Sequence, residues 1–569
     1  MSRLHAAELS RSAARLDDVR IAAALLALLT AFLLFHDLGG AALFDPDEGR
    51  NAEIAREVLV TNDWITPYYD FLPRLEKPMF FYAVAALSYK LFGVSEAAGR
   101  LPSAAAALGA LLLTCFFVRR IYGERAALWS GLVLVTSVQF NVFSRIVILD
   151  MLLAFSVTLA LIAYYRADIA GSRPEKRRYY FLMYSAAAAA TLVKGPIGFI
   201  LPGMIVVAAI AVRRKWSSFR EMDLGWGILI FLLITAPWYA WAEVRRPGYL
   251  AYFLGQEHFT RYLTAHFHRT KPWHYFFAVV GVGFFPWTFL LPAIAVRLRK
   301  RLDDVSLYAL LWAAVPFVFF SFSSSKMSEY LLPIYPALAI LAGKTLADAS
   351  GSGALRFLSA GWLILGAALF YFGLGLLLPG LFPAAMRELL AGLPRREMTA
   401  AALIASMLAL WTAGASFSGW RQQLFPVCCL ALGLNFFLAH RVIAPLSTYR
   451  SFKELGMQAA TVLRPANPPA PLVIYDTYLP SLLFYLDVRE PVWIVAHEAD
   501  DEIMGSFFLS AKKPAPAPGY GKVVWTDEEF DREWATRQLF VFTKDKRLAK
   551  LPGAKVLLRS ENIALVTNR

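Results

Sequence analysis

The sequence has little of what soluble and disulfide-bonded proteins are built from. Only 17% of its 569 residues are charged, whereas 58% are hydrophobic, and the mean hydropathy is +0.50. This composition excludes a soluble globular chain and indicates a multi-span membrane protein. The cysteines all lie in apolar runs, which excludes a disulfide framework and a cysteine-based zinc site. They are Cys115, Cys428 and Cys429.

Several motifs are also missing. The chain has no P-loop, no dinucleotide-binding fingerprint and no HExxH pair, so neither a nucleotide-fuelled mechanism nor a dedicated zinc site is supported. It has no internal repeats and no low-complexity tracts. The net charge of +15 does not point to a nucleic-acid partner, because lysine and arginine collect in the cytoplasmic loops of membrane proteins.

Thirteen apolar segments predict membrane-spanning helices. The basic stretch 1–20 precedes the first of them and is expected to be a cytoplasmic tail leading into an uncleaved span. The segments are 21–43, 97–118, 126–143, 149–165, 178–193, 196–212, 225–242, 275–296, 305–322, 329–347, 356–379, 399–417 and 424–442.

A further apolar run, residues 79–92, is short for a crossing and carries Lys90. If this run does not cross, four basic clusters fall on the same side as the basic N-terminus, so we interpret it as an interfacial or re-entrant helix. The clusters are 119–125, 173–178, 213–215 and 297–301. The first long loop and the C-terminal region then face outward, on the side opposite to the N-terminus.

The composition changes after about residue 443. We therefore predict a transmembrane domain over 1–443, all-α and of about thirteen helices, and a small α/β periplasmic domain over 444–569 that follows a proline-rich link. Six short runs in the second domain are typical of strands: 472–475, 491–495, 522–525, 539–543, 555–558 and 563–566.

The first long polar stretch, residues 44–78, gathers many charged side chains between apolar runs. It begins with DPDE, which is typical of a helix start: Asp45 would be the N-cap, Glu48 would close a capping box, and the helix would reach about Val60. Capping gives Asp47 no task of its own. Two uses of these acids stay open, helix capping and chemistry at the membrane surface.

Acidic side chains beside apolar spans are functional candidates, because charges at the membrane boundary are costly to keep without partners. Asp150 is expected at the outer end of the fourth span. Two interpretations remain open for it: an ion pair with Arg145 that satisfies both groups, or a carboxylate pair with Asp47 that faces one cavity.

Basic and aromatic side chains on the same outward loops would supply the second half of a site. Lysine and arginine bind phosphate through charge-assisted hydrogen bonds, and lipid headgroups are the alternative partner. Lys77 and Lys194 stand beside proline or Gly-Pro at span ends and are the stronger candidates. The predicted substrate-binding residues are Arg50, Lys77, Arg145, Lys194, His258, Arg261, Lys326 and Tyr330.

One outward stretch, residues 257–274, is rich in histidine. Interfacial anchoring is the favoured interpretation of these side chains, and a metal ion shared between Glu76 and His258 is the alternative. We expect that no cofactor is required, with a divalent metal left open.

The first loop resembles that of bacterial lipid-linked glycosyltransferases of the GT-C class, which are related to protein O-mannosyltransferases. The likeness lies in DPDEGRNAEIAREVLVTNDWITP followed by LPRLEKP. Within that family the sequence is most similar to members that transfer 4-amino-4-deoxy-L-arabinose to lipid A. The likeness continues at 99–103, 145–150, 191–196, 257–262, 326–336, 475–481 and 484–486.

The resemblance implies a many-helix fold in the inner membrane whose active site faces the periplasm. Asp47 matches the family's first-loop acid, Asp150 its second acid, and Lys77 the basic residue beside the donor phosphate. With Glu48, the two aspartates make up the predicted catalytic set. Gly49 and Asn51 depart from the enterobacterial pattern of the lipid A enzymes.

The expected function is transfer of aminoarabinose from undecaprenyl phosphate to a lipid A phosphate by single displacement. The expected partners are this donor, lipid A or another periplasmic acceptor, and membrane lipids, with the chain as a monomer. The alternatives are a protein O-mannosyltransferase-like activity, another lipid-linked sugar transfer, and a transporter or flippase. Transport predicts internal repeats, which the sequence lacks.

Overall fold

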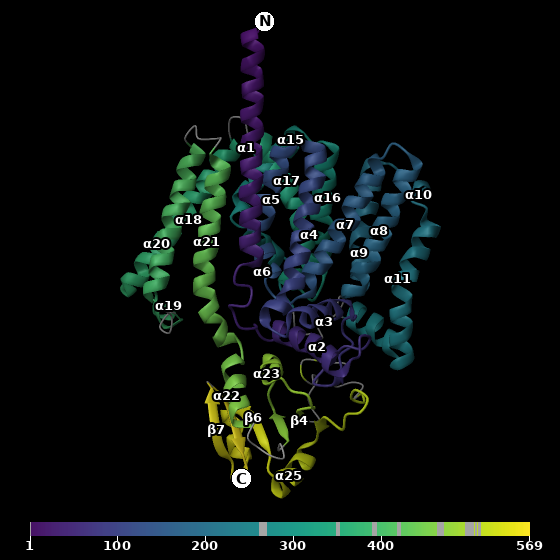
Figure 1. Ribbon diagram of the computed structural model, residues 1–569, viewed down its shortest axis with the longest axis vertical. Coiled ribbons are helices and arrows are strands. Elements are labelled where there is room, and N and C mark those ends of the chain that lie inside the picture. Colours follow the sequence, from purple (N-terminus) through teal and green to yellow (C-terminus); the bar gives the residue numbers. More distant parts are fainter. Residues whose placement is uncertain are drawn as a thin grey trace.

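The computed structural model describes residues 2–260, 270–348, 353–389, 395–417, 423–463, 471–495, 514–560 and 562–569, with Met504, Ser506 and Leu509. These residues form a bundle of long helices with a small sheet at one end (Figure 1). The two ends of the chain lie at opposite ends of the molecule. The fold is therefore that of a polytopic membrane protein.

Nine helices in the described ranges are long and apolar enough to cross a bilayer, or eleven if two bent pairs are each one span. Each of the thirteen predicted segments lies on one of these, on a bent pair, or on α8 or α9, so the number of crossings stays a prediction. The long helices are α1 (Ser2–Phe35), α4 (Glu96–Tyr122), α7 (Leu149–Ile169), α8 (Arg173–Lys194), α9 (Ile197–Arg213), α11 (Leu224–Arg245), α16 (Asp304–Phe322), α17 (Tyr335–Asp348), α18 (Gly353–Leu377), α20 (Arg395–Phe417) and α21 (Leu424–Leu446).

Two segments predicted as continuous helices are broken. The chain bends by 65° between α5 (Glu124–Thr136) and α6 (Val138–Ser144), and by 106° between α14 (Tyr275–Gly283) and the helical stretch Trp287–Lys300. The two breaks meet, because the Val138 N–H donates to the Phe285 carbonyl over 3.1 Å. Backbone groups freed inside a membrane protein need such a partner.

The first polar loop folds against the end of the bundle that faces the sheet (Figure 1). It contains α2 (Asp47–Thr61), a two-strand ribbon of β1 (Tyr68–Tyr69) and β2 (Leu72–Pro73), and then α3 (Phe80–Phe92). At about 1.5 Å per residue, the 13 residues of α3 are too short to cross the hydrocarbon layer. This agrees with the prediction of a helix that does not span.

The C-terminal region forms a six-stranded mixed sheet with the strand order β5-β4-β3-β6-β8-β7. All six predicted strands are present, while the domain boundary at residue 443 stays a prediction. The sheet packs with α22 (Lys453–Leu463), α23 (Pro480–Leu486) and α25 (Asp527–Thr536). The strands are β3 (Leu472–Tyr475), β4 (Trp493–Val495), β5 (Val524–Trp525), β6 (Phe540–Lys544), β7 (Lys555–Ser560) and β8 (Ile563–Thr567).

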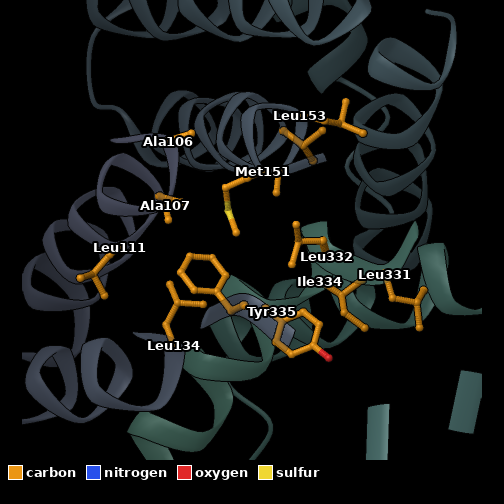
Figure 2. Packing of buried hydrophobic residues seen from close by; sticks show 14 of the residues in the cluster. Ala106, Ala107, Leu111, Leu134, Met151, Leu153, Leu331, Leu332, Ile334 and Tyr335 are labelled. Carbon is orange, nitrogen blue, oxygen red and sulfur yellow. The ribbon is translucent and has the colours of Figure 1, made fainter. Parts of the chain in front are cut away.

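An apolar core lies between the helices of the bundle (Figure 2). Met151 of α7 and Leu332 of the short helix η3 (Ser328–Ile334) share this interior with Ala107 of α4. All three side chains are buried. Since Met151 follows Asp150 and Leu332 lies three residues after Glu329, the core fixes the two segments that carry these acids.

Candidate active site

The start of α2 is not capped as the sequence predicted. The helix begins at Asp47, its N-cap position is Pro46, and no side chain caps it. Asp45 instead accepts a hydrogen bond of 2.5 Å from the Ser481 hydroxyl. Burial raises the pKa of Asp45 to about 7, and its hydrogen bonds with Ser481 oppose that rise. The prediction that Asp45 caps this helix is therefore wrong, because proline takes the cap position and Asp45 turns toward the C-terminal region.

Glu48 has the contacts of a structural residue. Its carboxylate is buried and receives two hydrogen bonds from Arg100, of 2.7 and 3.1 Å, and one from the Val147 N–H, of 3.0 Å. It also reaches back to the Phe44 N–H over 2.9 Å. These bonds tie the first loop to α4 and to the segment before α7. We therefore leave Glu48 out of the catalytic set that is proposed below.

Asp47, by contrast, is half-exposed. Its carboxylate forms an ion pair with Arg50 one turn further along α2, and 40% of its side chain is accessible. The Arg50 side chain is 17% accessible. An acid with this exposure can meet a ligand without leaving its helix, so Asp47 keeps the position that the sequence predicted for a reacting group.

Asp150 is buried and forms an ion pair with Lys194, the last residue of α8. The alternative pairing with Arg145 is wrong. Arg145 donates instead to the carbonyl oxygens of Leu33, at 2.8 Å, and His36, at 2.7 Å, near the end of α1. Arg145 thus satisfies the free carbonyls of a helix end, which is a structural use of a cation.

A third carboxylate, Glu329, belongs to the same cluster and was missed in the sequence. Glu329 is buried at the start of η3 and lies within electrostatic reach of Asp150, Lys194 and Asp47. Lys194 also lies over the Tyr330 ring, with its Nζ 5.0 Å from the ring centroid. Both predicted aspartates therefore lie within electrostatic reach of Glu329. The signal in the sequence was its place three residues after Lys326 in an outward loop.

Lys77 and Lys326 lie near opposite ends of the stretch 257–270. Lys77 forms an ion pair of 2.5 Å with the buried Glu257, and Thr270 forms a β-bridge with Ser325, the neighbour of Lys326. Arg261 lies outside the described residues, as does the side chain of His258, so neither can be placed in the site.

Lys326 differs from the other two lysines in its partners. It is only 7% exposed, it donates to the Ser323 carbonyl, and it contacts no carboxylate in the described part of the chain. Loss of hydration lowers the pKa of its ammonium group. A buried cation of this kind favours an anionic ligand, because such a ligand replaces the water that it has lost.

The metal alternative receives no further support. Within the ranges that the structure describes, no three His, Cys, Asp or Glu side chains are grouped closely enough to hold an ion. Glu76 instead accepts a hydrogen bond from Ser506 and lies 3.7 Å from Arg74. The metal site stays a prediction.

Comparison with known proteins gives consistent matches. The family model for dolichyl-phosphate-mannose-protein mannosyltransferase matches residues 76–241. An undecaprenyl phosphate-alpha-4-amino-4-deoxy-L-arabinose arabinosyl transferase of Shewanella sediminis is 31% identical over 328 residues, which are 58% of this chain and 60% of the relative. A relative of the same name from Pseudomonas paraeruginosa is 30% identical over 404 residues, or 70% and 71% of the two chains. The match thus spans about 60% of the length of the Shewanella protein.

The solved structures agree with the sequence matches. The crystal structure of ArnT from Cupriavidus metallidurans bound to undecaprenyl phosphate matches with a TM-score of 0.81 and 27% identity, over 96% of this chain and 98% of that one. The fold and the family match are those of multi-pass membrane glycosyltransferases. The chain belongs to the family of the undecaprenyl phosphate-aminoarabinose arabinosyl transferases, which confirms the resemblance in its sequence.

Proposed function

We propose that this chain transfers 4-amino-4-deoxy-L-arabinose from undecaprenyl phosphate to a phosphate of lipid A, at the periplasmic face of the inner membrane. The observation that carries the proposal is the charged cluster of Asp47, Asp150 and Glu329 with Lys194, together with the buried Lys326 three residues before Glu329. It occupies one end of a bundle whose fold matches, over almost its full length, a protein bound to undecaprenyl phosphate.

The donor phosphate is assigned to Lys326 and Lys77. When the bond between the sugar and the phosphate breaks, negative charge grows on the departing phosphate, and a preorganised cation stabilises it. Lys326 is buried without a carboxylate partner in the described residues, so an incoming phosphate improves its surroundings. Lys77 is already paired with Glu257 and would add its charge from the Glu257 end of the stretch 257–270.

The carboxylates are assigned to the sugar and the acceptor. Asp150 and Glu329 share one cation, Lys194, so a second cation that binds in the cluster would gain a carboxylate partner. The ammonium group of an amino sugar is such a cation, and a neutral sugar such as mannose offers none. Asp47 is the accessible member that can orient the sugar or the acceptor.

Transfer by single displacement to a phosphate acceptor does not require a strong general base. A lipid A phosphate is already anionic and can attack the anomeric carbon directly, while the carbon–oxygen bond to the polyprenyl phosphate breaks. A hydroxyl acceptor would instead have to lose a proton, and Asp47 would then accept it.

The test is mass spectrometry of lipid A from a strain that makes the donor but lacks its own transferase. Expression of the chain should add the mass of one aminoarabinose residue to lipid A, and the Asp47→Asn variant should not. Unmodified lipid A, with the wild-type chain inserted and the donor present, would contradict the proposal. Glycosylated protein under the same conditions would favour the mannosyltransferase-like alternative.

A further inference from the structure

Residues 480–492, which comprise α23 and the link from α23 to β4, lie beside α2. They contact the chain just before α2, α2 itself and the loop after it, although the helix and this segment come from opposite ends of the sequence. We call residues 480–492 the splint. The contacts with it are specific polar bonds rather than apolar packing alone.

At the first level the splint holds the chain just before the start of α2. The Ser481 hydroxyl donates to Asp45 Oδ2 over 2.5 Å and accepts from the Phe452 N–H over 3.0 Å. Gly49 allows this close approach, because a Cβ atom there would lie 2.7 Å from Ser481 Cβ and 2.8 Å from its Cα. Such distances leave no room for a side chain.

At the next two levels the splint fixes the rest of the helix and the loop after it. The buried Arg56 donates to Asp487 over 3.0 Å and to the Val488 carbonyl over 2.6 Å. The Val492 N–H donates to Asp70 over 2.9 Å. The opposite side of α2 is tied to the bundle through Glu48 and through Asn51, whose amide donates to the Val147 carbonyl. The helix is therefore held between two bodies.

We propose that the splint is a positioning element for the transfer reaction, which holds the first turn of α2 so that Asp47 stays at the Asp150–Glu329 cluster. The inference rests on the proposed function. No side chain caps α2, and the N–H groups of Glu48 and Gly49 donate instead to the Phe44 carbonyl, over 3.1 and 3.3 Å. The first turn is therefore held by the chain just before it, and the bond between Ser481 and Asp45 anchors that chain.

The test is a double-mutant cycle between Ser481→Ala and Asp47→Asn, measured as kcat and donor KM in proteoliposomes. If Ser481 acts through Asp47, S481A should lower kcat by roughly 10-fold or more with little change in donor KM, since a misplaced group costs rate rather than ground-state binding. In the D47N background the same change should have almost no further effect. Ser481→Thr keeps the hydroxyl and should restore most of the rate.

Two further variants keep the outcome decisive. Asp45→Ala removes the other partner of the same hydrogen bond and should also lower kcat with little change in donor KM. It therefore tests the inference even if the S481A protein folds poorly. Lys522→Ala changes an exposed ion pair with Glu529 in the same domain and should leave kcat unchanged. Wild-type kcat in both S481A and D45A, or an equal loss in the wild-type and D47N backgrounds, would overturn the inference. The failure of wild-type transfer itself would instead count against the proposed function.

Discussion

The start and the middle of α2 carry the same kinds of charged residue in opposite surroundings. At its start, Asp47 is 40% accessible and pairs with Arg50. One turn to three turns later, Glu53, Arg56 and Glu57 are completely buried beneath the C-terminal region. Glu57 accepts hydrogen bonds from two backbone N–H groups, those of Asp70 and Phe71.

The difference shows how burial separates structural charges from reactive ones. A carboxylate whose oxygens are used by backbone N–H groups or by a guanidinium has no capacity left for a ligand. A carboxylate that is paired but accessible keeps that capacity. By this criterion Asp47 is the reactive acid of α2. Glu53 instead holds Arg56, which docks the C-terminal region, and Glu57 holds the loop after the helix.

The largest expected effect concerns the buried set. Arg56→Ala removes the partner of Glu53, which accepts from Arg56 over 2.7 and 2.8 Å, and leaves that carboxylate buried and unpaired. Breaking a buried pair in this way costs roughly 3 to 5 kcal/mol of stability. Thermal unfolding in detergent should show a clearly lower midpoint. The control is Arg119→Ala, whose pair with Glu124 is exposed and should matter by less than about 1 kcal/mol. Equal unfolding midpoints for the two variants would contradict the distinction between buried and exposed charged pairs.

A somewhat smaller effect is expected at Asp45, and it depends on pH. Because its pKa is raised from 3.8 to about 7 in the folded protein, the folded state keeps a proton that the unfolded state loses, and wild-type stability falls as the pH rises from about 4 to 7. Asp45→Asn stays neutral and still accepts from Ser481. Unfolding midpoints should therefore favour the variant increasingly up to pH 8, by about 2 to 4 kcal/mol in total. Parallel pH curves for the two proteins would show that Asp45 does not titrate in this range.

The smallest effect is on donor binding. Lys326→Ala should weaken the binding of undecaprenyl phosphate to nanodisc-embedded protein by roughly 10- to 100-fold, because a charge-assisted hydrogen bond contributes about 1.5 to 3 kcal/mol. The unliganded variant should be no less stable than the wild type, since the desolvated ammonium is removed. Lys344→Ala, at the far end of α17, is the matched control. An unchanged Kd for K326A would exclude Lys326 from the phosphate site.

Much of the fold follows from local sequence patterns, and these elements were predicted correctly from the sequence. The apolar segments and the six strands depend on runs of neighbouring residues, so each was found near its observed place. The partners of the charged groups depend on tertiary packing instead. Asp150 pairs with Lys194, 44 residues away, rather than with the nearby Arg145, and Asp45 meets Ser481 across 436 positions. No periodicity in the sequence encodes which helix ends meet.

The most direct test of the account compares Asp47→Asn with Asp45→Asn at pH 6. At that pH Asp45 is mostly protonated, because its pKa is about 7, so its replacement by a neutral amide changes little. We expect Asp45→Asn to keep near-normal transfer. Asp47→Asn should lose roughly two orders of magnitude or more in kcat, with an unchanged unfolding midpoint. The opposite result, with transfer lost in Asp45→Asn and kept in Asp47→Asn, would contradict the assignment of Asp47 as the reactive acid of this helix.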